Sequence, residues 1–251
     1  MTLPRAALAV LLVVVLAPLV RVAAAVPPRS LLNELAAPQT LAALRTSASA
    51  SIIAVGVATL LGVPAAYALA RGDRRIRTAA LAALSVPLAL PPVAGGIALL
   101  ALLTPSTPLG AWLDAHGVRA IDDLAGVACA EFFVSASIVV FAATAAFGDV
   151  DPALEEAART LGAGPLRVAF TIALPLAGRG IAVGIVLAWL RAIGEYGATS
   201  ILAYRPASLP IALVTALSAD GLGRALALTD AFALLSLLAV VVATGLRRQP
   251  V

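Results

Sequence analysis

The chain has 251 residues, of which 62% are hydrophobic and 12% charged, and its mean hydropathy is +1.05. Soluble domains are only about half apolar, so a water-soluble fold could not cover this much apolar surface. A membrane-spanning helix needs about 20 mostly apolar residues, which leaves room for roughly five to seven spans with short loops. The composition therefore predicts an all-α integral membrane protein that has no sizeable soluble domain.

All 17 basic residues are arginine, and the lack of lysine excludes an ordinary nucleotide-hydrolysis site, because a P-loop uses a lysine on the phosphates. The single His116 excludes a zinc site built on paired histidines, and the single Cys129 excludes an intrachain disulfide. The arginines cluster beside apolar stretches, which is typical of membrane orientation and not of nucleic-acid binding. We therefore predict no catalytic residue, metal or cofactor in this chain.

The first apolar stretch, residues 6–26, has two interpretations. Arg5 before it and Ala23 to Ala25 near its end fit a cleaved signal peptide. Retention as a first membrane helix is the simpler interpretation, since further spans follow. With the polar segment after it, this helix forms a first unit, residues 1–39, whose last part is periplasmic.

Five more apolar stretches predict five more spans, for a total of six, with loops at 104–123 and 203–228. These stretches are residues 47–70, 78–103, 124–147, 178–202 and 229–246. The third of these six spans contains Pro87, Pro91 and Pro92, which remove backbone donors, so we expect it to be bent or locally unwound.

The arginine distribution predicts the orientation. With a cytoplasmic N-terminus, ten arginines lie on the inner side and six on the outer side, while Arg191 lies within a span. The densest group, between Arg71 and Arg77, then falls inside, as cytoplasmic loops require. Both termini are therefore predicted to be cytoplasmic, including a short tail at residues 247–251.

A charged segment at residues 151–175 separates the fourth and fifth spans and is predicted to be a helical hairpin. Asp151 suits the N-cap, and Pro152 suits the first helical position. Glu155 and Glu156 lie early enough to favour the positive end of the helix dipole.

Gly162 ends this helix as a residue that can take positive φ, and Pro165 can begin a second short helix that runs to about residue 173. An ordinary amphipathic connector on the membrane surface would satisfy the same signals. It would not need the residues that follow to match a family pattern in both spacing and type.

Such a pattern is present, namely E-A-A, three residues, G, nine residues, I-x-L-P. Its members are Glu156, Ala157, Ala158, Gly162, Ile172, Leu174 and Pro175. The pattern resembles the cytoplasmic coupling loop of ABC importer permeases. The resemblance implies a type I importer architecture in which this hairpin, from Asp151 and Glu155 onward, inserts into a groove of an ABC ATPase.

The resemblance also implies the partners. ATP and magnesium would be bound by an ATPase dimer, and an extracytoplasmic binding protein would deliver the substrate. One coupling motif per chain against two ATPase subunits implies a second copy of this chain, with the pathway between the copies. The location would be the inner membrane of a prokaryote.

Two further runs resemble the permeases of the molybdate, tungstate and sulfate group. Residues 187–199 read L-A-W-L-R-A-I-G-E-Y-G-A-T, with Tyr196 where these permeases usually have Phe, and residues 90–96 read L-P-P-V-A-G-G. The resemblance covers residues 40–246, which would form the permease domain. It implies translocation of molybdate or tungstate by alternating access, with sulfate, thiosulfate or another small solute as the alternative.

The same runs supply the candidates for the pathway or gate. These are Pro91, Pro92, Glu131, Arg191, Gly194, Glu195, Tyr196, Gly197 and Thr199. Arg191 and Glu195 are four residues apart on one helix and so can face each other. A lone carboxylate would repel an oxyanion, so the anion hypothesis requires Arg191 to neutralise Glu195 if both face the channel. A clamp between helices and a gate both remain open for this pair.

Glu131 departs from the uncharged residue expected in relatives, and it could pair with an arginine or lie near the outer interface. A proton-coupled secondary transporter, with Glu131 and Glu195 as carriers, would explain both carboxylates but not the coupling motif. A rhomboid-like protease is excluded because His116 falls in a predicted loop and no G-x-S-x-G occurs.

Overall fold

The computed structural model describes residues 2–248, and within them every regular element is helical. The elements are α1 (Thr2–Ala25), α2 (Pro28–Ala36), α3 (Pro38–Arg71), α4 (Arg74–Ala89), α5 (Pro92–Leu103), α6 (Pro108–Ala115), α7 (Leu124–Gly148), α8 (Pro152–Thr160), α9 (Pro165–Val168), a π-helical turn (Ala169–Ala173), α10 (Leu174–Ile193), α11 (Gly197–Leu202), α12 (Leu209–Ala219) and α13 (Leu222–Arg248). The predicted all-α class is therefore confirmed.

Within residues 2–248, five helical segments are long and apolar enough to cross a membrane. Helices α4 and α5 pass the same test together, but they meet at an angle of 106°, and counting this bent pair as one span gives the predicted total of six. The bend lies at Pro91, and Pro92 then begins α5. The predicted bend in the third span is thus confirmed, and its cause is the missing amide donors of these prolines.

Other predicted boundaries are wrong. The fifth span does not continue to Leu202, because α10 ends at Ile193 and the chain turns before α11 begins at Gly197. The expected loops contain the short helices α2, α6 and α12. Each has a proline within its first two positions, which suits a helix start because the missing N–H would be unpaired there anyway.

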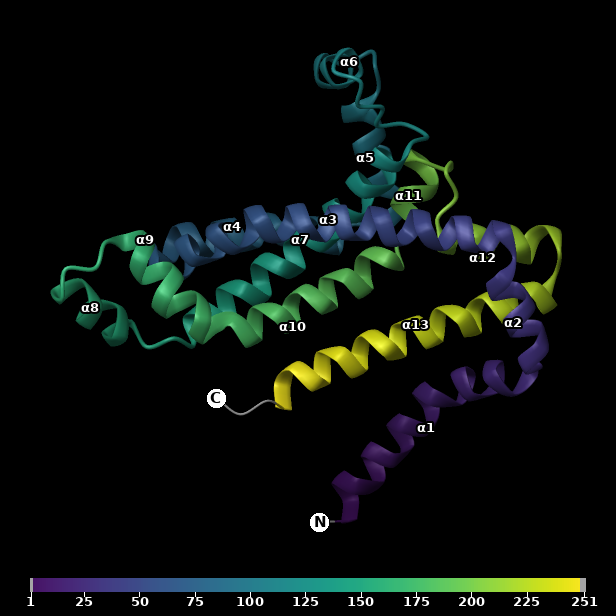
Figure 1. The fold of residues 1–251 in the computed structure, drawn as a ribbon, viewed down its shortest axis with the longest axis horizontal. Coiled ribbons are helices and arrows are strands. Elements are labelled where there is room, and N and C mark those ends of the chain that lie inside the picture. Colours follow the sequence, from purple (N-terminus) through teal and green to yellow (C-terminus); the bar gives the residue numbers. More distant parts are fainter. Residues whose placement is uncertain (1, 249–251) are drawn as a thin grey trace.

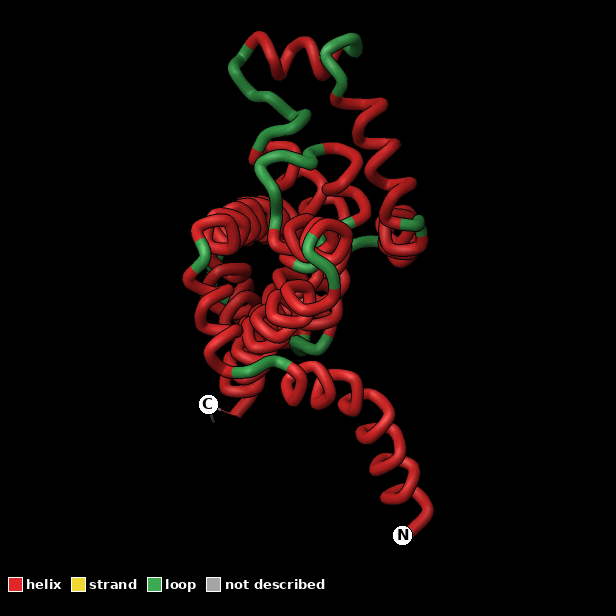
Figure 2. Tube along the Cα trace, turned by 90° about the vertical axis from the view of Figure 1, so that its right-hand side faces the viewer, coloured by secondary structure: helices red, strands yellow, loops and turns green. Residues whose placement is uncertain are grey.

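The helices form an elongated bundle in which α3, α4, α7, α10 and α13 run along the long axis (Figure 1). The α8–α9 hairpin lies at one end, and α2 and α12 lie at the other. The segment α5–α6 projects sideways from the middle. No residue of 4–25 is buried, and α1 extends away from the bundle in both views (Figures 1 and 2). Of the predicted tail, residues 247–248 end α13, and residues 249–251 lie outside the described part.

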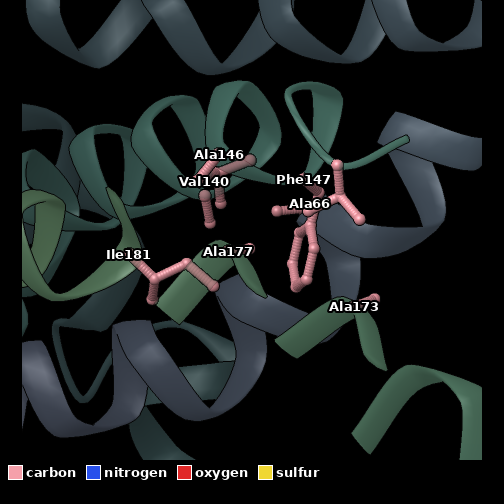
Figure 3. Packing of buried hydrophobic residues seen from close by; sticks show 9 residues of the cluster. Ala66, Val140, Ala146, Phe147, Ala173, Ala177 and Ile181 are labelled. Atoms are coloured by element: carbon pink, nitrogen blue, oxygen red, sulfur yellow. The ribbon is translucent and has the colours of Figure 1, made fainter. Parts of the chain in front are cut away.

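Small residues allow α7 and α10 to pack closely. Gly180 and Gly184 are one helical turn apart on α10 and lie against Ala146 and Ala142 of α7. Close backbone approach through such small residues is the usual basis of helix association in lipid, where burial of apolar surface gives little driving force. Beside this contact, Phe147 and its neighbours join α3, α7, the π-helical turn and α10 into one cluster (Figure 3).

We expect Gly184→Ala to destabilise the bundle, because the added methyl group would overlap the Ala142 Cβ and force α7 and α10 apart. Overpacking of this kind costs about 1–3 kcal/mol. Thermal unfolding of the detergent-solubilised protein measures the effect as a lower Tm. The matched control is Gly178→Ala on the same helix, where no described atom lies within 4 Å of the new methyl group. Equal Tm values for the two variants would contradict this packing account.

Candidate functional site

The hairpin between α7 and α10 forms as its local chemistry predicts. Asp151 caps α8 by accepting a hydrogen bond from the Ala153 amide (2.9 Å), and Pro152 occupies the first helical position. At the other end Gly162 has φ +86°, and its amide donates to the Arg159 carbonyl (2.9 Å). This left-handed conformation favours glycine, so the sequence signal for the turn is confirmed.

The second half of the hairpin differs from its prediction. A second helix does begin at Pro165, but it passes without interruption through the π-helical turn into α10. Ile172 and Leu174 are half-buried in this continuous segment, and Pro175 lies in the first turn of α10. Ile172 and Leu174, the two motif residues before Pro175, are therefore part of the continuous helical segment Pro165–Ile193 that is long enough to span the membrane.

Glu155 occupies a different position from its expected one at the dipole end of a surface helix. It is 1% exposed and lies against the C-terminal end of α3. Arg71 donates to Oε1 of Glu155 from Nε (2.8 Å) and Nη2 (2.6 Å), and the Tyr67 hydroxyl donates to Oε2 (2.8 Å). Arg159, one turn along α8, approaches Oε2 at 3.3 Å.

These contacts fix the charge state of Glu155. Burial by itself raises the pKa of this carboxyl, but the hydrogen bonds from Arg71 and Tyr67 and the charges of Arg71 and Arg159 outweigh it. The pKa therefore lies below its usual range, and the group is an ionised carboxylate near neutral pH. The sequence alone did not identify Arg71 and Tyr67 as functional residues. The one available signal was that Arg71 is the first residue of the densest basic group in the chain.

The rest of α8 faces outward. Glu156 and Ala157 are exposed, and Ala158 is half-buried. Apolar side chains accompany them on the hairpin, since Leu161 is 88% exposed and Leu166 73% exposed. This combination of a carboxylate, small residues and uncovered leucines is suited to a protein partner with an apolar groove.

A second group of candidates lies where α10 ends. Arg191 Nη1 contacts Glu195 Oε2 at 2.5 Å, which confirms that the two side chains face each other. Glu195 Oε1 also accepts a hydrogen bond from the Ala198 amide (2.8 Å), so this buried carboxylate holds the start of α11. The pair thus braces the break between α10 and α11.

The two broken spans meet at this place. A methyl group on Gly197 would lie 2.6 Å from the Pro92 Cβ, and one on Gly96 would lie 2.8 Å from the Ala198 Cα. Gly194 and Tyr196 are exposed at the turn, whereas Thr199 is fully buried in α11. The lack of a side chain at Gly197 therefore allows a close contact with the start of α5.

A small cavity of about 100 Å³ lies beside this contact. Pro91 and Pro92 line it at the α4–α5 bend, Phe133 lines it on α7, and Arg191 lines it from the end of α10. Arg191 is the single charged residue of this lining. Its side chain is 34% exposed, so the guanidinium is accessible while it remains bound to Glu195.

Glu131 on α7 is 1% exposed, and neither of its carboxyl oxygens has a hydrogen-bond partner among the described residues. The expected pairing of Glu131 with an arginine is therefore not found within residues 2–248, and its expected place near the outer interface stays a prediction. Residues 2–248 also contain no group of three or more His, Cys, Asp or Glu side chains placed to hold a metal ion.

Comparison with known families decides the assignment. The family model described as the binding-protein-dependent transport system inner membrane component matches residues 58–249. The chain belongs to this family. The predicted resemblance is thereby confirmed, and the permease is a multi-pass inner-membrane component of a transporter whose ATP is bound by a separate ATPase and whose substrate is delivered by a binding protein.

Several relatives share much of the permease. A "Probable molybdenum ABC transporter permease protein" of Haloferax volcanii is 38% identical over 216 residues, which are 86% of this chain and 79% of that one. The molybdenum transport system permease protein of Mycobacterium tuberculosis is 36% identical over 81% of this chain and 74% of its own length. The molybdate/tungstate transport system permease protein of Pyrococcus abyssi is 38% identical over 71% of this chain and 66% of its own length.

The fold of the permease is that of a solved importer. A chain in the crystal structure of a bacterial alginate ABC transporter, in complex with its alginate pentasaccharide-bound periplasmic protein, superposes with a TM-score of 0.71. The superposition covers 98% of this chain and 93% of that chain at 18% identity. At that identity the likeness concerns the fold alone.

Proposed function

We propose that the permease translocates molybdate or tungstate in an ATP-driven importer by alternating access. The observation that carries this proposal is the substrate named for its relatives, which share 36–38% identity over 71–86% of the chain. The motifs around Leu90 and Arg191 support it, since they lie together at the two broken spans.

The domain organisation and orientation follow. Residues 1–39 form a first helix with a periplasmic segment, residues 40–246 form the permease domain, and residues 247–251 form a cytoplasmic tail. The hairpin and the basic group that begins at Arg71 lie at the same end of the bundle, which supports a cytoplasmic assignment for that end. Both termini then lie in the cytoplasm.

The outward face of the hairpin is the docking surface for the ATPase. Glu156 offers a carboxylate there, Ala157 permits close approach, and Gly162 makes the turn that presents Leu161. Each chain has one such hairpin and an ATPase dimer has two grooves. A homodimer of the permease is therefore the simplest assembly, with the pathway between the protomers.

The pathway passes the meeting point of the two broken spans. Arg191 faces the small cavity beside Pro91 and Pro92 and provides guanidinium donors for a tetrahedral oxyanion. Glu195 keeps Arg191 oriented and makes the net charge of the pair close to zero. The anion is therefore bound weakly enough to be released. Gly194, Tyr196, Gly197 and Thr199 shape the turn around this point.

Glu131 is the feature that favours the proton-coupled alternative. A carboxylate buried without a partner is strongly disfavoured, so the neutral acid is the favoured form. In an ATP-driven permease the neutral acid is a structural group of α7, whereas in a secondary transporter it would be the carrier of the coupled proton.

Charge-removal variants separate an anion contact from a structural brace at Arg191. We expect Arg191→Gln to lower uptake by about tenfold or more, as the loss of a hydrogen bond to a charged group implies. The double variant R191Q/E195Q removes both charges and leaves no unpaired charge. If the pair is only a brace, the double variant should transport better than Arg191→Gln alone. We expect it to remain equally inactive, and recovery would contradict the anion contact.

Elemental analysis of cells that lack the permease tests the substrate. Grown on trace molybdate and tungstate, they should contain several-fold less molybdenum or tungsten than complemented cells, with unchanged sulfur and phosphorus. Cells that carry Gly162→Pro are the matched control, since proline cannot adopt φ +86° and the hairpin should lose its coupling turn while the protein remains inserted. Unchanged metals would refute the oxyanion assignment, and a fall in sulfur would indicate sulfate.

A further inference from the structure

Glu155 is the single buried side chain of α8, a helix that the structure describes completely. The adjacent Glu156 is exposed, as are Leu154 and Ala157. A partner protein that docks on the hairpin therefore meets the exposed side chains and does not reach Glu155. The function of Glu155 must lie in what it contacts inside the permease.

The Glu155 carboxylate is held on both oxygens by a neighbouring helix. Arg71 donates two hydrogen bonds to Oε1, and Tyr67, one helical turn earlier on α3, donates one to Oε2. Arg71 also donates to the Val150 carbonyl (3.2 Å) in the linker that leads into α8. Charge-assisted bonds in this two-pronged arrangement fix orientation as well as distance.

The C-terminal end of α3, which contacts Glu155, is itself packed against α7. The Tyr67 ring packs edge-on against Phe147 of α7 at 5.2 Å between centroids. Phe147 belongs to the cluster that joins α3 to α7 and α10 (Figure 3). A displacement of α8 therefore acts on α3 at a point where α3 is packed against α7, and not on a free chain end.

Helix α3 then reaches the opposite end of the permease. It continues through Pro64 over 34 residues, a length of about 50 Å at 1.5 Å per residue. At its far end the buried Ser47 hydroxyl accepts a hydrogen bond from the Leu209 amide (2.8 Å), where α12 begins. Thr40 donates to Glu34 of α2 (2.6 Å) at the same end. One helix thus contacts the hairpin and the outer helices.

The covalent connections of α8 are less direct. Towards α7 the chain passes through the non-helical residues 149–151, and towards α10 it passes through the turn at Gly162. Neither connection is a continuous helix from α8 to the end of the bundle that holds α2 and α12. Residues 149–151 interrupt the first, and α10 in the second stops at Ile193. The side-chain joint to α3 is the rigid route.

We propose that the Glu155–Arg71–Tyr67 cluster is the joint through which movement of the coupling hairpin is passed to α3, and that α3 carries this movement to the outer helices α2 and α12. Glu155 and Arg71 are positioning residues that act through α3 and do not contact the ATPase. Because this joint serves the ATP-driven import proposed above, wild-type transport must be established in the same experiment.

The test uses the complete complex of permease, ATPase and binding protein in lipid nanodiscs and proteoliposomes. For Glu155→Gln we expect the ATPase to co-purify at the wild-type ratio and basal ATP hydrolysis to stay near the wild-type rate. Stimulation by the loaded binding protein and uptake of labelled molybdate should both fall by about tenfold or more, which is the range of a typical coupling between sites.

Two further variants are needed in case Glu155→Gln does not fold, one with a milder change in the cluster and one as a control. Tyr67→Phe keeps the ring against Phe147 and removes only the hydroxyl donor, so it should lower stimulation and uptake in the same direction but less. Arg75→Gln removes an exposed arginine from the same basic group and should leave all readouts unchanged.

Each outcome decides the matter. Loss of the ATPase from an otherwise folded Glu155→Gln complex would assign Glu155 to the docking surface and overturn the joint. Normal stimulation in Glu155→Gln would overturn it as well, and if that variant does not fold, normal stimulation in Tyr67→Phe does so. Failure of the wild-type complex to import molybdate would instead refute the substrate proposal. The joint is then tested by the ATPase ratio and by stimulation with the binding protein purified together with its native cargo.

Discussion

The position of the coupling hairpin depends on one buried carboxylate and the arginine that neutralises it. The hairpin is otherwise exposed, and the energy that orders it comes from Glu155, Arg71 and Tyr67 together with the packing of Val168 and Ala173. A buried carboxylate deprived of its partner is costly, so this helix cannot leave α3 cheaply while the charge remains. The exposed face of the hairpin is thus carried by a rigid attachment, which the proposed transmission of force from an ATPase requires.

A second constraint acts inside the membrane, where lipid cannot satisfy free backbone groups. The permease breaks two of its spans, at Pro91 and after Ile193, and packs the two breaks against each other through Gly96 and Gly197. Glu195 binds one amide exposed by the second break, and Arg191 neutralises Glu195. The two irregular segments therefore contact each other next to a small cavity, the kind of place where transporters commonly bind their cargo.

Much of this could be predicted from the sequence, because it depends on local chemistry. The spans follow from apolar runs, the α4–α5 bend from prolines, the α8 ends from Asp151 and Gly162, and the Arg191–Glu195 pair from its spacing of four. The contact of Glu155 with Arg71 could not be predicted, since it joins residues 84 apart and both look like ordinary surface charges in the sequence. The sequence does not reveal the break between α10 and α11, because the apolar runs on either side of Gly194 to Gly197 together have the length of a single span.

The central claim is that ATP hydrolysis by a partner subunit drives import through this permease. Proteoliposomes that contain the permease and its ATPase, with binding protein outside, allow a direct measurement of labelled molybdate accumulation under two conditions. In one, ATP is enclosed without an ion gradient, and in the other, a pH gradient is imposed without ATP. The account predicts accumulation only with hydrolysable ATP. Accumulation driven by the pH gradient alone would contradict it and would indicate a proton-coupled transporter, the alternative in which Glu131 and Glu195 are the carriers.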